Sequence, residues 1–529
     1  MKKNIIWILS TILLAAAVVC GIWFYSRNQR QQDPRRYLLS FVPDKTPFIA
    51  VINGNDLLKN AGYTDYQPGI PVDLPIPLSS LKTMIGSSDA EFLNSLAAAE
   101  GINLNAMVLA TWYREDDWLH PLLMASVTDH DKLTASLNGI DELEATSGSQ
   151  GKIWSVNGNY IFYIPDNEDV LFMTEAMWVE KSNGDYSWED PEDAVASMVK
   201  FIKSSESSHL ASWKTDYLVR PELSASALLD KKNLESGMRP KDAEYFKQYL
   251  DLMDASWQYL GLQANLDNQT LKAVVNALDA QGRFTDLTNM EVSCKRTPTP
   301  TDNSVGLFLP VRQFCSSEDF RYEFAHFLGD MLYSGSERND YWSSNYSSDT
   351  TAVNQSPRFT EDQVFIYRSL KDNLMNLNSF AWRMNFYDSS FDVQEQLQFT
   401  YERDALNFYN TLYNNPVPYF RKDFSGLKIY NPEIYGNKVD LTMTQNDTYV
   451  WFGQPMEDHL QLHPLAFAFA NLSRSDLSAL AQGFSPKFGI KASCDVTQRA
   501  AVLKLTLTET DKTLLENIFD TLKLMSSIL

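Results

Sequence analysis

The sequence predicts an α+β protein in which an N-terminal transmembrane helix precedes four β-α-β-β-α-like units with largely antiparallel sheets. Three observations predict this class. An uncharged apolar segment lies close to the N-terminus. Beyond it, two alternating apolar and polar segments joined by a short polar turn occur four times. A segment with helical periodicity follows each pair, and long and short units alternate, so we interpret the units as an internal duplication.

The first element, Ile5–Tyr25, is a run of 21 residues without charge or proline. A helix of this length spans roughly 30 Å, the thickness of the hydrocarbon core of a bilayer. Trp7, Trp23 and Tyr25 lie near its ends, and such amphipathic rings prefer the membrane interface. We therefore expect an uncleaved signal anchor. A cleaved signal peptide, which normally has a shorter apolar region, and a lipid attached at Cys20 are the alternatives.

Charges on the two flanks of this segment give opposite indications about orientation. Lys2 and Lys3 precede it, as in export signals, whereas a more basic following flank favours a cytoplasmic position for the rest of the chain. The remainder is poor in lysine and arginine and rich in tyrosine, tryptophan, asparagine and serine. We expect a single-pass membrane protein with its bulk in the bacterial periplasm. The basic residues of the following flank are Arg27, Arg30, Arg35 and Arg36.

Each repeated unit begins with an apolar strand, a polar step and a short helix, and it continues with the hairpin and a second helix. The last hairpin is the clearest, because Leu503, Leu505 and Leu507 alternate along one strand face. The predicted hairpins span 107–127, 257–278, 377–401 and 487–508, and the strands before them span 48–52, 223–229, 305–311 and 465–470. Further hairpins are predicted at 153–164 and 439–452.

These elements define the predicted domain boundaries. The Pro/Thr-rich sequence RTPTPTD is typical of a linker between two halves. The predicted segments are an N-terminal flank at 1–4, the anchor at 5–25, a juxtamembrane linker at 26–37, the first α+β half at 38–290, a linker at 291–303 and the second α+β half at 304–529.

The segment Val42–Ile52 reads VPDKTPFIAVI and leads into Asn55-Asp56-Leu57-Leu58. Together with the anchor and the repeats, it resembles bacterial cell-envelope proteins that are catalogued only as domains of unknown function. The resemblance covers the layout of most of the chain and implies a location in the cell envelope. It carries over no catalytic residue, and the clean lipoprotein cysteine of many such proteins is missing here.

Composition limits the kind of partner that the protein binds. The apolar fraction of 44% allows a large folded core, whereas the net charge of −22 opposes binding to nucleic acid, which needs a basic surface. Cys294, Cys315 and Cys494 are the cysteines outside the apolar segment, and no CxxC pair supports a zinc site. A disulfide between Cys294 and Cys315 and buried free thiols both remain open.

Motifs for catalysis or metal binding are incomplete. His459 and His463 have helical i, i+4 spacing, but no HExxH glutamate lies between them. Ser79-x-x-Lys82 and Ser197-x-x-Lys200 match an SxxK pattern without the SDN or KTG elements that accompany it in penicillin-interacting enzymes. The chain contains no GxSxG, Walker A or GxGxxG motif. We therefore predict no catalytic, cofactor-binding or metal-binding residue.

The acidic residues have ordinary structural explanations. Asp116-Asp117 falls in a predicted hairpin turn, and Glu192-Asp193 falls in the first turn of a helix that is predicted to start at Asp190-Pro191. The segment from 180 to 193 is interpreted as an acidic stretch that ends in this helix start.

A polar segment at 334–357 is the most suggestive feature for function. Tyr333, Tyr341, Trp342 and Tyr346 lie in or beside it, and aromatic side chains among serine and asparagine form adaptable contact surfaces for protein or glycan. Local packing beneath a long loop is the alternative. The sequence leaves the question of an enzyme open but favours a non-enzymatic binding or scaffold protein of the envelope. The alternative is a hydrolase, or an accessory subunit of one, that acts on envelope polymer or peptide.

Overall fold

The structure is a computed structural model. The residues that it describes are 33–63, 67–71, 94–114, 119–148, 150–156, 159–180, 185–203, 210–240, 243–244, 247, 256–289, 297–314, 369, 372–387, 390–414, 420–423, 426–434, 437–456, 465–480 and 486–528.

The chain divides into two compact units, and each is described by itself. The first contains Met1–Glu244, Trp257–Thr285 and Lys512–Leu529, and the second contains Tyr245–Ser256 and Asp286–Asp511.

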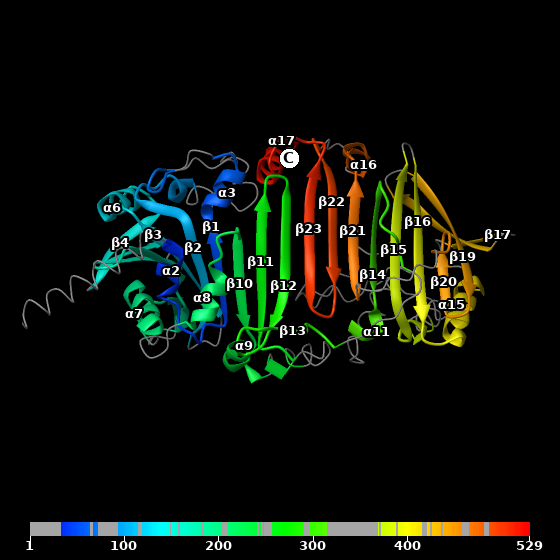
Figure 1. Cartoon of the computed structure of the whole chain (residues 1–529), viewed down its shortest axis with the longest axis horizontal. Helices are drawn as coiled ribbons and strands as arrows, with labels where there is room; N and C mark the ends of the chain where they lie inside the picture. The colour runs from blue at the N-terminus through cyan, green and yellow to red at the C-terminus, as the bar shows by residue number, and fades with distance from the viewer. Residues whose placement is uncertain are drawn as a thin grey trace, which may run out of the picture. The chain divides into compact units, whose positions relative to one another are not determined.

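Antiparallel strands dominate the first unit (Figure 1). They are β1 (Phe48–Asn53), β2 (Ile102–Tyr113), β3 (Leu119–Val127), β4 (Leu143–Gly148), β5 (Gly151–Val156), β6 (Tyr160–Pro165), β7 (Val170–Glu175), β8 (Trp178–Glu180), β9 (Tyr186–Trp188), β10 (Ala225–Asp230), β11 (Tyr259–Asp267), β12 (Thr270–Leu278) and β13 (Phe284–Thr285). The strand order of its sheet is β13-β12-β11-β10-β1-β2-β3-β7-β6-β5-β4. The β8–β9 hairpin stands apart as a two-stranded sheet.

Helices cover both faces of this sheet. They are α2 (Pro34–Leu39), α3 (Gly54–Asn60), α6 (His130–Asn138), α7 (Pro191–Lys203), α8 (Ser212–Leu218), α9 (Lys231–Gly237) and α17 (Leu514–Ile528). Because side chains alternate along a strand, Met124 packs into a core with α2, α7 and α8, whereas the adjacent Ala125 packs into a second core with α6. The sheet is therefore buried on both faces along these strands.

The second unit is also built from antiparallel strands. They are β14 (Ser304–Leu309), β15 (Leu377–Tyr387), β16 (Ser390–Phe399), β17 (Phe420–Asp423), β18 (Gly426–Ile434), β19 (Asn437–Asn446), β20 (Tyr449–Phe452), β21 (Ala466–Leu472), β22 (Gly489–Val496) and β23 (Ala500–Thr508). Their order is β23-β22-β21-β14-β15-β16-β20-β19-β18-β17. Its helices are α11 (Val311–Phe314), α15 (Glu402–Asn414) and α16 (Arg474–Leu480).

The predicted fold class, an α+β protein with an N-terminal transmembrane helix and four β-α-β-β-α-like units with largely antiparallel sheets, is wrong. Within each unit the described strands, β8 and β9 aside, pair into one continuous antiparallel sheet, and most helices are short. The reason is that a strand edge left unpaired attracts another strand. β1 pairs with β10 in the first unit, and β14 pairs with β21 in the second. Each of these strands would lie at an exposed edge if the repeated units formed separate small sheets.

The predicted transmembrane helix belongs to the same correction. No helix among the described residues is long and apolar enough to cross a membrane. The segment 5–25, on which that prediction rested, lies outside the described residues. The first described residue is Asp33, whose side chain accepts a hydrogen bond from the Arg35 backbone N–H at 3.0 Å and caps α2.

Candidate functional site

The side chains predicted as a contact surface, Tyr333, Tyr341, Trp342 and Tyr346, lie outside the described residues. The same holds for Ser79, Lys82, Asp116, Asp117, Cys294, Cys315, His459 and His463.

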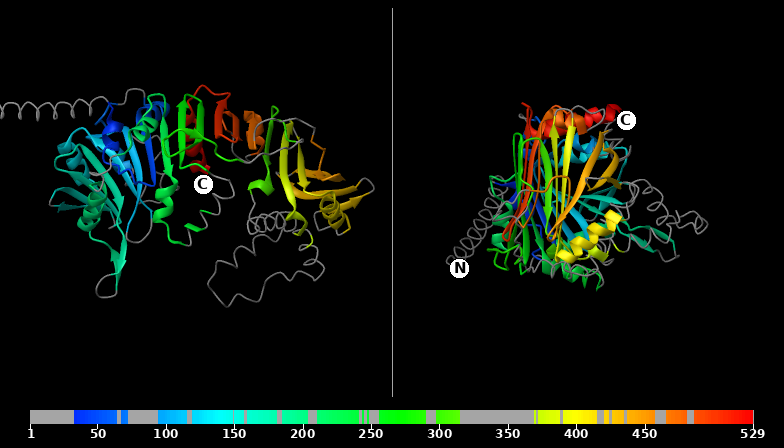
Figure 2. Two further views of the ribbon diagram at one scale, coloured as in Figure 1. Left: turned by 60° about the horizontal axis from the view of Figure 1, so that its bottom comes forward. Right: turned by 90° about the vertical axis from the view of Figure 1, so that its right-hand side faces the viewer.

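A different group of exposed aromatic side chains lies on the β8–β9 hairpin, which projects from the sheet of the first unit (Figure 2, left). Trp178 pairs with Trp188, and Glu180 pairs with Tyr186, so strand alternation places these four side chains on one face. Trp178, Tyr186 and Trp188 are 56%, 58% and 37% exposed. We call Trp178, Glu180, Tyr186 and Trp188 the aromatic face.

Contacts within the aromatic face fix its side chains relative to one another. The rings of Trp178 and Trp188 pack edge to face, with centroids 4.9 Å apart and an interplanar angle of 74°. The Tyr186 hydroxyl donates a hydrogen bond to Glu180 Oε2 at 3.2 Å. The opposite face of the hairpin carries Val179 and Ser187, which are half-buried. Three rings and one carboxylate thus form a small preassembled surface.

A buried ion pair holds the root of the hairpin to the sheet. Arg114, which follows β2, contacts Glu189 Oε1 at 2.5 Å, and their side chains are 3% and 9% exposed. The same Glu189 oxygen accepts from the Met177 backbone N–H at 2.8 Å. Arg114 also donates to the Glu175 carbonyl at 3.0 Å and lies 5.2 Å from the centre of the Trp112 ring. Because an isolated two-stranded hairpin is only marginally stable in water, this clamp gives the aromatic face a fixed position.

Sequence reasoning missed this hairpin, although a signal was present. Tyr186–Trp188 alternates aromatic and polar residues, and an Asn183-Gly184 step, which is a strong short-range turn signal, lies between it and Trp178–Glu180. The start of the next helix was predicted correctly: α7 begins at Pro191, and Asp190 Oδ1 accepts from the Glu192 backbone N–H at 3.0 Å.

An open cleft of about 430 Å³ lies beside α7 and the strands β5 and β6. Acidic residues of the cleft lie at the start of α7 and lysines lie at its end. This arrangement complements the helix dipole, so the charges have a structural explanation. The lining includes Ile153, Tyr163, Val199, Glu192, Asp193, Lys200 and Lys203. We assign no ligand to it.

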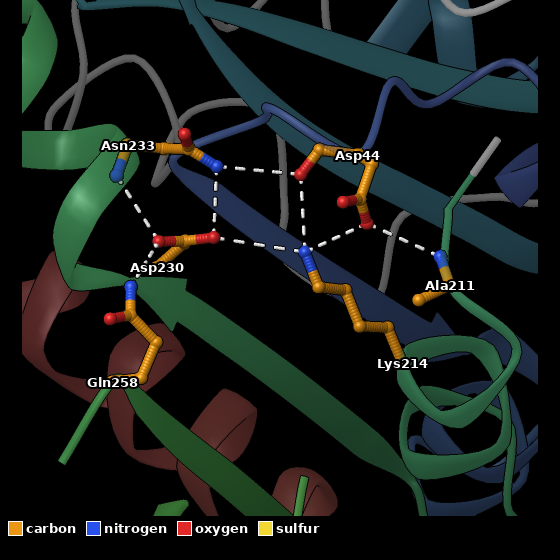
Figure 3. Close-up of polar contacts among 6 residues, drawn as sticks. All are labelled: Asp44, Ala211, Lys214, Asp230, Asn233 and Gln258. Atoms are coloured by element: carbon orange, nitrogen blue, oxygen red, sulfur yellow. Dashed lines mark hydrogen bonds and ion pairs between the residues drawn. The ribbon is translucent and has the colours of Figure 1, made fainter. Parts of the chain in front are cut away.

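The most extensive buried charge cluster in the described part of the first unit centres on Lys214 of α8 (Figure 3). Its ammonium group lies 2.9 Å from Asp44 Oδ1, 3.1 Å from the Asp44 carbonyl oxygen and 3.7 Å from Asp230 Oδ2. The side chains of Lys214 and Asp230 are 4% and 6% exposed, whereas that of Asp44 is 39% exposed. The Lys214 ammonium group therefore directs its N–H donors at Asp44 and Asp230.

Neighbouring groups satisfy the Asp230 carboxylate. Asp230 Oδ1 accepts from the Asn233 backbone N–H at 3.1 Å, which caps α9, and from the Gln258 side chain at 3.0 Å. Lys214 Nζ lies 4.9 Å from the Tyr259 ring centre, and burial, followed by the charges of Asp230 and Asp44, raises the pKa of Tyr259. Buried, strongly perturbed groups are candidates for catalysis. Here the pairing joins the segment before β1 to α8, β10 and α9, which is a structural role.

A metal site has no support in the described residues, where no three His, Cys, Asp or Glu side chains are grouped to hold an ion.

Comparison with known proteins gives little further guidance. No family model and no curated protein matches the chain. Among solved structures, it is similar to crystal form I and crystal form III of TP0453, each with 8% identity and a TM-score of 0.26 over 48% of this chain and 80% or 81% of that chain. A likeness this weak carries no argument about function.

Proposed function

We propose that this protein is a non-enzymatic binding protein of the cell envelope and that the aromatic face of the β8–β9 hairpin is its recognition surface. The observation that carries the proposal is the exposure of three aromatic rings on a hairpin whose root is clamped by the buried Arg114–Glu189 pair. Aromatic side chains are enriched at the energetic centres of interfaces. Rigid rings lose little conformational entropy on binding, so such a surface is suited to recognition.

The exposed area sets the strength that this surface can reach. If each ring offers about 150–250 Å² and roughly half is exposed, the face presents on the order of 300 Å². At about 25 cal/mol per Å², its burial contributes roughly 7 kcal/mol before the costs of association are subtracted. The hairpin alone therefore supports a weak or transient contact.

Retention of a partner by matched variants tests the proposal. The full chain is immobilised and incubated with envelope extract, and it is compared with Trp178→Ala/Trp188→Ala. A control, Tyr387→Ala/Tyr401→Ala, removes aromatic rings that are 57% and 61% exposed in the second unit. We expect a component that the unmodified chain and the control retain and the hairpin variant loses.

Two results would contradict the proposal. Equal retention by all three chains would show that the aromatic face is not the recognition surface. A reproducible turnover of envelope polymer or peptide, abolished by a single Asp, Glu or Ser substitution, would replace binding with the hydrolase alternative.

A further inference from the structure

We infer that the aromatic face binds a cationic segment of a partner protein, a stretch of chain that presents arginine or lysine side chains. The inference rests on the proposed function, because it names the chemistry of the partner that the same surface recognises.

The charge around the hairpin is the first argument. Between Glu175 and Asp193 the chain carries seven acidic residues and one lysine. Glu189 is neutralised by Arg114, but Glu180 forms no ion pair with any described cation. Electrostatic complementarity determines which partners approach such a surface and how fast they do so. A basic segment gains from this field, whereas an acidic partner or an anionic lipid surface is repelled.

The second argument is that this chain already holds buried cations with the same pair of groups. Arg114 lies over the Trp112 ring and pairs with Glu189. The Lys214 ammonium group likewise lies near an aromatic ring and pairs with Asp44. In both places a ring face and a carboxylate share one cation, because the ring quadrupole adds to the attraction of the carboxylate.

The aromatic face repeats this combination at the surface. The Glu180 carboxylate accepts from the Tyr186 hydroxyl at 3.2 Å and is therefore held beside an exposed ring. Trp178 and Trp188 add two further rings at 4.9 Å from each other. A guanidinium or ammonium group on the partner can stack on a ring while it pairs with Glu180, and its aliphatic stem covers apolar surface.

Binding of a defined peptide tests this inference. A fluorescein-labelled hexa-arginine peptide is titrated with the full chain at two salt concentrations, and a hexa-glutamine peptide serves as the uncharged control. We expect hexa-arginine to bind more tightly than hexa-glutamine and to weaken as salt rises. Glu180→Gln and Trp178→Ala/Trp188→Ala should each weaken binding by about 10-fold, in keeping with cation–π and charge-pair strengths.

Two control variants separate the face from general acidity. Asp141→Asn removes one exposed carboxylate elsewhere in the first unit and should leave hexa-arginine binding within about 2-fold. Glu180→Asp keeps the charge and should retain most of the binding. Circular dichroism of each variant confirms that it is folded. An equal loss for Asp141→Asn and Glu180→Gln would overturn the inference, because diffuse net charge would then explain the binding.

The outcome also separates this inference from the proposed function. If hexa-arginine fails to bind while envelope retention still depends on Trp178 and Trp188, the cationic chemistry is wrong and the recognition surface stands. If the hairpin variant loses binding to neutral phosphatidylcholine vesicles instead, a lipid surface is the partner and the inference is overturned.

Discussion

Neutralising Glu189 should release the hairpin. Glu189→Gln keeps an acceptor for the Met177 N–H but leaves the Arg114 guanidinium, whose side chain is 3% exposed, without a counter-charge. Breaking a buried pair in this way costs about 3–5 kcal/mol, because a charge stays buried and uncompensated. We expect the loss to appear first as local opening, since the hairpin is stable only through its attachment. Hydrogen exchange by mass spectrometry over residues 175–190 measures it.

Matched variants make this prediction refutable. Asp216→Asn breaks an exposed ion pair, in which the side chains of Asp216 and Arg36 are 66% and 50% exposed. This change should cost no more than about 0.5 kcal/mol. Arg114→Met combined with Glu189→Gln removes both charges, keeps an acceptor for the Met177 N–H and should recover most of the protection that Glu189→Gln alone loses. If hydrogen exchange gives Glu189→Gln an opening free energy within about 1 kcal/mol of that of the unmodified chain, the clamp is refuted.

Further predictions concern stability elsewhere and at the aromatic face. Burial raises the pKa of Glu395 to about 7 from an ordinary value of 4.5. The folded state therefore holds this proton more tightly than the unfolded state, and the unfolding free energy should fall as pH rises from about 4.5 to about 7. We expect a fall of roughly 2 kcal/mol, less than the full pKa difference gives, because Glu395 is only half-buried. Glu395→Gln should remove that slope in denaturant unfolding at pH 5 and pH 8. Lys214→Met should lower the unfolding free energy by about 3 kcal/mol, because Asp230 is left buried without its counter-charge, and thermal unfolding checks it. Trp178→Ala and Trp188→Ala should each change the unfolding free energy by about 0.5 kcal/mol or less in the same assay, because exposed side chains contribute little to folding.

Local patterns predicted individual elements well. The predicted hairpin at 487–508 is β22–β23, and the one at 257–278 is β11–β12. The turn predicted at Asp267-Asn268 places Asn268 at φ 44°, a conformation that asparagine tolerates better than most residues. These features depend on residues that are close in the sequence, so a single amino-acid sequence is sufficient to predict them.

Pairings between distant segments could not be predicted in this way. Nothing in Phe48–Ile52 or Ala225–Asp230 states that these strands pair with each other, because edge pairing depends on which edges remain exposed after the hairpins form. The candidate site was missed for a related reason. The fixed position of the rings depends on a clamp from Arg114, which is distant from the hairpin in the sequence.

Face-specific crosslinking tests the central claim most directly. A photoreactive benzoylphenylalanine replaces Tyr186 on the aromatic face or the adjacent Ser187 on the opposite face, in the full chain in living cells. Neighbouring strand residues point to opposite faces, so the two chains differ only in the side of the hairpin that they probe. We predict a crosslinked partner from position 186 that position 187 does not give and that Trp178→Ala abolishes. Equal adducts from both positions, or adducts indifferent to Trp178, would contradict recognition by the aromatic face.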